Sequence, residues 1–310
     1  KLLDRRDFLK KAATGAFLIS APKILTAQTS NSNIIDWSSG MKPLYCLAYI
    51  NPGVESHKDQ EKYVAKYPIA LVPQDERSYY RKWKDDVKTL NPDLKFLAYQ
   101  MVIEETTVPG PGHEHMRRFA QNTWATYPGG FTPTVTFSTS VTKKRKRIYD
   151  PRSEVWQDSF INACEKTLES YPYEGLFLDQ CTVYAKAALL PQARAEMMIG
   201  LEQTLIRLRE RFPDKLILGN SSYNLTGLNG EMNEGRENDL AKEMAYYQGH
   251  ADPRIELFHY YMQGQDDITT AKEKFKIALA NKAFFGTGVN AQTIRWYDFF
   301  DEVLSEYTIS

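Results

Sequence analysis

Two acidic residues stand at the ends of two strand-like segments, about fifty residues apart in the chain. Asp179 ends the apolar run that opens at Gly175 within the stretch Tyr173–Gln180, and Glu234 ends the segment 230–234. An apolar run without polar alternation is typical of a parallel strand that is covered on both faces. In α/β folds the chemistry lies where such strands end. Two carboxyl groups at one such mouth are what the cleavage of a glycosidic bond requires.

The two acids suit different roles in that chemistry. Aspartate has the shorter side chain and suits the ionised partner, whereas glutamate reaches farther and suits the proton donor. Glu231 is a fallback for the donor. The structural alternative for Asp179 is a helix N-cap or a turn former after a strand.

Polar and aromatic side chains also lie near other predicted strand ends, and they are candidate substrate-binding residues: Tyr49, Tyr99, Gln180, Asn220 and Tyr261. An asparagine at a strand tip suits a substrate hydroxyl, and aromatic faces around a mouth stack on sugar rings. Packing inside the fold is the plainer role for most of the aromatic residues.

Eight strand candidates alternate for the most part with helical patterns: 44–50, 69–72, 95–102, 175–179, 216–220, 230–234, 255–261 and 283–288. This alternation predicts an α/β fold, a (β/α)8 TIM barrel. The 310 residues and the apolar content of 42% are enough to bury one large core. A doubly wound open sheet is the rival architecture, but no glycine-rich phosphate fingerprint supports it.

Residues 104–144 break the alternation with prolines, glycines and a β-rich piece at 132–141. We expect a long insertion between strands three and four, placed over the barrel mouth, where such loops carry specificity. The basic run 143–147 is typical of a solvated loop or a strand edge, and contact with an acidic polysaccharide is the functional alternative.

Asp150 and Pro151 precede the helical pattern that leads into strand four. We expect Asp150 to be the N-cap of this helix and Pro151 to occupy its first position. A catalytic role for Asp150 is the alternative.

The first 27 residues have the pattern of an export signal. Arg5 and Arg6 open a twin-arginine motif, and a weakly apolar run with a small-residue ending follows it. This pattern predicts export by the Tat machinery to the periplasm or beyond, with a basic amphipathic helix as the alternative. Residues 28–43 are then a linker, and residues 44–310 form the catalytic barrel domain.

Charge and cysteine usage limit the partners and cofactors. Removing six basic and two acidic residues with the signal changes a net charge of zero to about −4, which argues against a nucleic-acid partner. Cys46, Cys164 and Cys181 are typical of buried free thiols, although a nucleophilic Cys181 is an alternative. We expect no metal or other cofactor, with His113 and His115 as the alternative metal site. No run after the signal is long enough to span a membrane.

Several short motifs occur in an order that resembles a known group of enzymes. These motifs are YDP at 149–151, then EGLFLDQ, LILGN and MNEG. In this order they resemble bacterial (β/α)8 glycoside hydrolases, especially hypothetical glycosyl hydrolase family 15 and endo-polygalactosaminidase-like relatives, most closely over residues 148–235. The resemblance implies that Asp179 and Glu234 are the catalytic pair, although many relatives have an acid or an Asn where this chain has Gln180. The sequence therefore predicts an exported glycoside hydrolase that cleaves a polysaccharide, with a non-catalytic carbohydrate-binding barrel as the alternative.

Overall fold

The computed structural model describes residues 42–49, 60–74, 78–106, 134–139, 142–182, 191–220, 222, 225–235, 254–264, 267–288 and 294–306. They all belong to one compact unit, 33–310. The expected export signal, nearly all of the expected linker, and His113 and His115 lie outside this part of the chain. No helix in the described ranges has both the length and the apolar character needed to cross a lipid bilayer.

Eight parallel strands form the central sheet. In sheet order they are β1 (Tyr45–Leu47), β2 (Ile69–Val72), β3 (Lys95–Met101), β7 (Gly175–Asp179), β8 (Leu216–Asn220), β9 (Gly230–Glu234), β10 (Leu257–Tyr261) and β11 (Phe284–Gly288). A parallel bridge between Leu44 and Phe285 joins the first strand to the last, and the backbone N–H of Phe285 donates to the carbonyl oxygen of Pro43 at 2.9 Å. The sheet therefore closes on itself, and the prediction of a (β/α)8 TIM barrel is confirmed.

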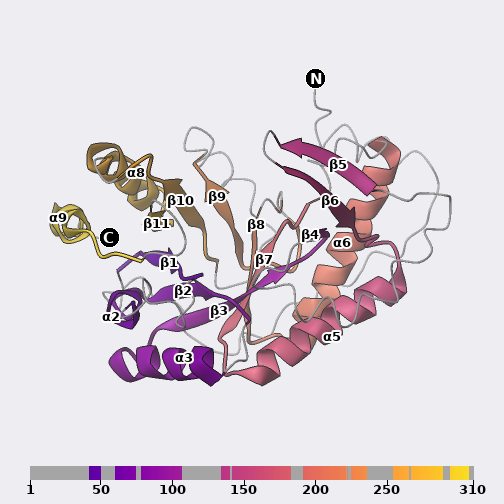
Figure 1. The fold of residues 1–310 in the computed structure, drawn as a ribbon, viewed down its shortest axis with the longest axis horizontal. Helices are drawn as coiled ribbons and strands as arrows, with labels where there is room; N and C mark the ends of the chain where they lie inside the picture. The colour runs from indigo at the N-terminus through magenta and orange to yellow at the C-terminus, as the bar shows by residue number, and fades with distance from the viewer. Residues whose placement is uncertain are drawn as a thin grey trace. The chain divides into compact units, whose positions relative to one another are not determined.

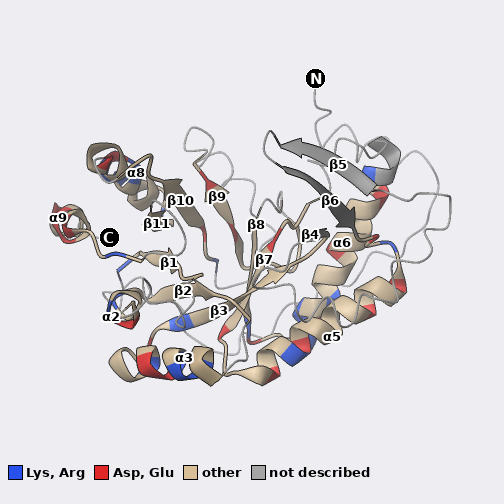
Figure 2. Cartoon of the chain, in the orientation of Figure 1, with Lys and Arg blue, Asp and Glu red and all other residues tan. Residues whose placement is uncertain are grey.

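Helices lie outside the ring of strands: α2 (Glu61–Val64), α3 (Ser78–Leu90), α5 (Glu154–Ser170), α6 (Pro191–Arg211), α8 (Ile268–Ala280) and α9 (Asp298–Glu306) (Figure 1). Their apolar faces pack on the strands, as α3 does through Tyr80, Trp83 and Val87. Charges of both signs are carried mainly by the helices, whereas the barrel strands are mostly uncharged (Figure 2).

Alternate residues of the strands fill the barrel interior, as the period of two in a β-strand requires. This interior cluster consists of Tyr45, Leu47, Ile69, Leu71, Leu97, Phe177, Leu216, Leu218, Met232, Ile255, Leu257 and Phe284. Strand residues of the opposite parity face the helices and join the larger outer core. At Gly230 a Cβ atom would overlap the carbonyl oxygen of Ile255, so the close approach to the segment before β10 requires glycine there.

A small antiparallel sheet lies in the chain between β3 and β7, with the strand order β4 (Glu104–Thr106), β6 (Thr142–Ile148) and β5 (Thr134–Thr139). Strands β4 and β5 fall within the predicted insertion 104–144, whereas β6 begins in it and continues to Ile148. The basic run 143–147 lies in the central strand β6, so it is neither a loop nor an edge of this sheet. The backbone N–H of Val102 donates to the carbonyl of Asp179 at 3.0 Å, and that of Tyr149 donates to the carbonyl of Ile103 at 2.9 Å. Both ends of the insertion are therefore attached beside the carboxyl end of β7.

The start of α5 differs from the prediction. The N-cap is Ser153, whose side chain accepts from the backbone N–H of Trp156, and the helix begins at Glu154. Asp150 instead accepts from the backbone N–H of Arg152 at 3.0 Å and pairs with its guanidinium at 2.9 Å. Asp150 therefore closes a turn that precedes the cap, and the cap assigned to it was wrong.

Candidate active site

Three polar side chains reach the carboxyl end of the barrel interior. Asp179, Asn220 and Glu234 are the last residues of β7, β8 and β9, and each follows a member of the interior cluster by two positions. Residues two apart on a strand point to the same face, so all three side chains point toward the barrel axis at its carboxyl end. This is the end at which TIM-barrel enzymes carry their active sites.

The carboxylate of Asp179 is bound from both sides. In the sheet β7 lies between β3 and β8, and each neighbouring strand supplies one donor. The phenol of Tyr99 donates to Oδ2, and the amide of Asn220 donates to Oδ1 at 2.9 Å. The backbone N–H of Gln180 adds a donor to Oδ1 at 2.8 Å, and this residue has a φ of 56°. Three donors therefore hold this carboxyl group in one orientation.

Two of the five predicted substrate-binding residues form hydrogen bonds to Asp179. Tyr99 and Asn220 bind Asp179, and they hold its carboxylate in a fixed orientation. Gln180 contributes its backbone N–H to the same group. Tyr49 packs against Tyr99 edge to face, with ring centres 5.0 Å apart, so it supports the same wall of the mouth.

Glu234 has a more open setting. Its side chain is exposed, and the phenol of Tyr261 on the neighbouring strand β10 donates to Oε1 at 2.9 Å. Tyr261 is itself 42% exposed, the highest value among the predicted substrate-binding residues. This carboxyl group and its phenol partner are therefore accessible from solvent, unlike the nearly buried amide of Asn220 beside Asp179.

The charges of the two carboxyl groups raise the pKa values of the same two tyrosines, Tyr99 and Tyr261. Burial raises the pKa of Tyr99, and the charges of Asp179 and then Glu234 raise it further. Burial also raises the pKa of Tyr261, with further contributions from the charge of Glu234 and from that of Asp179. Both phenols therefore lie within electrostatic range of both acids.

Glu231 does not face this mouth. It lies one residue out of phase with the interior cluster, is 3% exposed, and accepts a hydrogen bond from the hydroxyl of Ser222. The fallback assignment of Glu231 as proton donor is therefore not supported, because its side chain points toward the outer core instead of the barrel axis.

Burial also bears on whether the cysteines are structural thiols or whether Cys181 is a nucleophile. Cys46, Cys164 and Cys181 are buried free thiols, as predicted. Burial raises the pKa of Cys181, and the nearby charges of Glu231 and Asp179 raise it further. A protonated, buried thiol is a poor nucleophile, so the geometry does not favour catalysis by Cys181.

His259 was missed by the sequence reasoning. It lies beneath the mouth, 3% exposed, with Nδ1 at 3.1 Å from the hydroxyl of Tyr45 and its ring centre 4.3 Å from that of Tyr261. In the register of β9 and β10 it stands opposite Glu234. The signal that was available is its position two residues before Tyr261, which places both side chains on the same face of β10.

Burial lowers the pKa of His259 to about 3, and this predicts a pH dependence of stability. The unfolded chain binds a proton at this residue below pH about 6.5, whereas the folded protein does not until pH about 3. Protonation therefore favours unfolding, and the His259 contribution to the free energy of unfolding is largest above pH about 6.5 and is lost as the pH falls toward 3, by at most about 1.4 kcal/mol per pH unit.

Urea denaturation of wild type and His259→Asn at several pH values measures this contribution. Asparagine keeps a polar group near Tyr45 but does not titrate, so the variant should lose less stability between pH about 6.5 and 4. Equal slopes in the two proteins would show that His259 is not the source of the pH dependence.

Within the described ranges no group of three or more His, Cys, Asp or Glu side chains is arranged to hold a metal ion. Asp179 and Glu234 each accept a hydrogen bond from a tyrosine phenol, and Asp179 also accepts one from the amide of Asn220.

Comparisons with known proteins show a likeness of fold at low sequence identity. No protein-family model matches the sequence, and no curated protein matches it either. Among solved structures, an alpha-galactosidase from Thermus thermophilus in complex with p-nitrophenyl alpha-D-galactopyranoside aligns with a TM-score of 0.56 and 14% identity over 86% of this chain and 62% of that one. An alpha-galactosidase from Geobacillus stearothermophilus in complex with stachyose aligns with a TM-score of 0.51 and 12% identity over 86% of this chain and 42% of that one.

The glycoside hydrolase domain of PelA from Pseudomonas aeruginosa aligns more weakly, with a TM-score of 0.42 and 10% identity over 78% of this chain and 81% of that one. At these identities the likeness to the two galactosidases shows the (β/α)8 fold, and this chain spans less than two thirds of either. The closer resemblance to family 15 and the endo-polygalactosaminidases stays a prediction.

Proposed function

We propose that the protein is an exported glycoside hydrolase that cleaves a polysaccharide or oligosaccharide, with Asp179 and Glu234 as its paired carboxyl groups. The observation that carries the proposal is that these two acids end strands β7 and β9 at the carboxyl end of the barrel, both in phase with the interior cluster. The glycoside hydrolases that share the fold are consistent with it.

The strand order supports a suitable separation of the two groups. Only β8 lies between β7 and β9. Two strand spacings amount to about 10 Å between backbones, and side chains that point toward the axis approach each other more closely than that. Glycosidase carboxyl pairs stand about 5 to 9.5 Å apart, the shorter separations giving a covalent intermediate and the longer ones leaving room for a water molecule.

Asp179 is the ionised member of the pair in this proposal. Tyr99, Asn220 and the backbone of Gln180 stabilise its negative charge. Its carboxylate either attacks the anomeric carbon, forming a glycosyl ester, or takes a proton from the water that attacks this carbon. In both cases the bond from the anomeric carbon to the leaving oxygen breaks, and its electron pair stays with that oxygen.

Glu234 is the proton donor. Glu234 is exposed, and among the described residues one phenol donates to it, at Oε1, so the other carboxyl oxygen is available to a bound glycan. This oxygen delivers a proton to the leaving oxygen as the glycosidic bond breaks. Tyr261 orients the carboxyl group, and the exposed part of its ring is available to contact a sugar. Tyr49 completes the wall of tyrosines on the other side of the mouth.

The proposed site of action is outside the cytoplasm. The twin-arginine segment in residues 1–27 supports export of the folded chain through the Tat machinery. A polysaccharide in the periplasm or beyond is then the natural substrate for a barrel with an open mouth.

A screen for new reducing ends tests the proposed function. The mature chain is incubated with a panel that includes stachyose, p-nitrophenyl alpha-D-galactopyranoside and galactosamine-containing, neutral and acidic polysaccharides. We expect at least one member to be cleaved, with no cleavage by the Asp179→Asn/Glu234→Gln double variant. Binding of a glycan without any product, by calorimetry on the same panel, would instead favour the non-catalytic carbohydrate-binding barrel.

A further inference from the structure

His259 lies in the barrel interior next to Tyr261. Both side chains follow Leu257 of the interior cluster in steps of two along β10, so both point toward the barrel axis. The two ring centres are 4.3 Å apart and the ring planes meet at 64°, which is an edge-to-face contact. His259 is 3% exposed, whereas Tyr261 is 42% exposed. A buried ring therefore packs against an exposed one.

A buried tyrosine fixes the orientation of the His259 ring. The hydroxyl of Tyr45 in β1 lies 3.1 Å from Nδ1 of His259, and Tyr45 is fully buried. In the closed sheet β11 lies between β10 and β1, so this hydrogen bond spans the place where the barrel closes. The imidazole thus has a polar partner on the side of β1 and the ring of Tyr261 as a second contact.

Gly286 provides the space for this hydrogen bond. It stands opposite His259 in the register of β10 and β11. A Cβ atom at this position would lie 2.6 Å from Cζ of Tyr45 and 3.0 Å from Nδ1 of His259. Glycine therefore allows the side chains of the two neighbouring strands to meet across β11.

Tyr261 extends this set of contacts to Glu234. Its phenol donates to Oε1 of Glu234 at 2.9 Å, and His259 stands opposite Glu234 in the register of β9 and β10. The hydroxyl of a tyrosine is placed by the rotation of two side-chain bonds, so its position depends on what the ring packs against. For the exposed Tyr261, one such contact is a ring that is itself buried and hydrogen-bonded.

We propose that His259 is a positioning residue for the proton donor. Held by Tyr45, it fixes the ring of Tyr261, and Tyr261 in turn orients the carboxyl group of Glu234. This role rests on the proposed function, because it needs Glu234 to donate a proton. Burial lowers the pKa of His259 to about 3, so the imidazole is uncharged at neutral pH and acts on Tyr261 through packing instead of charge.

Kinetics on a cleaved glycan and on the p-nitrophenyl glycoside of the same sugar test this role in the full chain. His259→Ala should lower kcat for the glycan by roughly 10- to 10²-fold, the scale expected for a misplaced catalytic group, with a smaller change in KM. The p-nitrophenyl glycoside should lose far less, because its leaving group departs without a proton. His259→Phe restores a ring beside Tyr261 and should recover part of the loss.

Two milder variants test the support of the imidazole. Tyr45→Phe removes the hydroxyl that lies near Nδ1 and keeps the ring, and Gly286→Ala places a methyl group between Tyr45 and His259. Both should slow the glycan more than the p-nitrophenyl glycoside, in the same direction as His259→Ala. Agreement among the three variants does not depend on the folding of any one of them.

A cavity elsewhere in the barrel is the control for lost stability. Ile69 opens β2 and is fully buried in the interior cluster, so Ile69→Ala should destabilise the barrel but change both substrates alike. In the Glu234→Gln background, His259→Ala should cause no further loss on the glycan, because the group that it positions is already absent.

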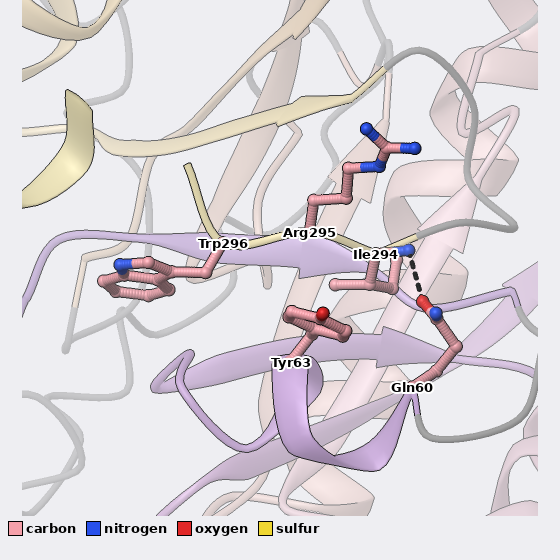
Figure 3. A pocket seen from close by; sticks show the side chains of 5 residues that line it. All are labelled: Gln60, Tyr63, Ile294, Arg295 and Trp296. Carbon is pink, nitrogen blue, oxygen red and sulfur yellow. Dashed lines mark hydrogen bonds between the residues drawn. The ribbon is translucent and has the colours of Figure 1, made fainter. Parts of the chain in front are cut away.

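NMR of the protein labelled with ¹³C at tyrosine Cζ tests the contacts without substrate, with Tyr261 assigned by Tyr261→Phe. Glu234→Gln should shift the Tyr261 resonance, and this shift should be smaller when His259 is alanine. Comparing the two backgrounds cancels the effect of the imidazole ring itself. The control is Tyr63, which is 40% exposed and lines a separate cavity of about 340 Å³ with Gln60, Ile294, Arg295 and Trp296 (Figure 3). Its resonance should move in neither variant.

Equal losses on both substrates in His259→Ala, or losses that add fully to those of Glu234→Gln, would overturn the positioning role. So would a Tyr261 resonance that responds to Glu234→Gln equally in both backgrounds. If wild type cleaves no glycan but the response of Tyr261 depends on His259, the proposed function fails and the contacts from His259 to Glu234 stand. Cleavage of a glycan with an unchanged response of Tyr261 would do the opposite.

Discussion

Replacing Asp179 with asparagine is expected to lower kcat/KM for the cleaved glycan by about 10²- to 10⁴-fold, the range for loss of a catalytic acid or base. The amide can neither attack the anomeric carbon nor take a proton from water. It does fit the same space and hydrogen-bonding partners. Its oxygen can accept from Asn220 and the Gln180 backbone, while its nitrogen donates to the hydroxyl of Tyr99. The barrel should therefore stay folded, and reducing-end release together with urea denaturation separates the two effects.

Asp158→Asn is the matched control for this variant. Asp158 is an exposed acid of α5 that pairs with Arg207, so its replacement should change stability by no more than about 0.5 kcal/mol and leave activity intact. Full activity of Asp179→Asn on a glycan that wild type cleaves would exclude Asp179 from the chemistry. Loss of activity in both variants would point to a general loss of structure instead.

The barrel was predictable from sequence because its strands are short apolar runs that are bounded by turn residues. The predicted segments 69–72 and 230–234 coincide with β2 and β9. A strand covered on both faces leaves a continuous apolar run in the sequence, and glycine or proline marks where the run stops. The first strand was predicted over 44–50 and covers Tyr45–Leu47, with Leu44 forming a single bridge to Phe285 that closes the barrel.

The start of α5 was not predictable in the same way. Asp150 and Ser153 are both good N-caps, and they lie three positions apart. Which of the two becomes the N-cap of α5 depends on whether Asp150 forms a turn of its own before the helix. The turn at Asp150 is stabilised by its bonds to the Arg152 backbone and guanidinium, and Arg152 in turn pairs with Glu196 of α6. This last contact links residues far apart in the chain, so the sequence pattern alone does not contain it.

In the candidate site, the positions of the acids were predictable but their partners were not. To predict that a carboxyl group lies at the mouth, it is enough to know where the strand ends and which face the residue occupies. The period of two also places Glu234 and Glu231 on opposite faces of β9. The donors to Asp179 come from two other strands, and their identity depends on strand order and register. The pairing of His259 with Tyr45 spans 214 residues and exists only because the barrel closes.

Glu234→Gln is expected to slow the cleavage of a natural glycan by about 10²- to 10⁴-fold, but to slow the cleavage of an activated p-nitrophenyl glycoside of the same sugar far less. A sugar alkoxide is a poor leaving group and needs a proton as it departs, whereas p-nitrophenolate leaves without one. Asp179→Asn removes the group that acts on the anomeric carbon, so it should slow both substrates. The ratio of the two kcat/KM losses, measured for each variant, therefore reports which acid donates the proton.

Glu302→Gln serves as the control for this experiment, because Glu302 is an exposed acid of α9 that pairs with Lys272 and should affect neither substrate. If Glu234→Gln slows both substrates equally while Asp179→Asn slows only the glycan, the two roles are exchanged, and the bound carboxylate of Asp179 is the donor. If Glu234→Gln retains full activity on the glycan, Glu234 is not the proton donor. Asp179 would then act with a different proton donor, and the hydrogen bond between Tyr261 and Glu234 would have a structural role only.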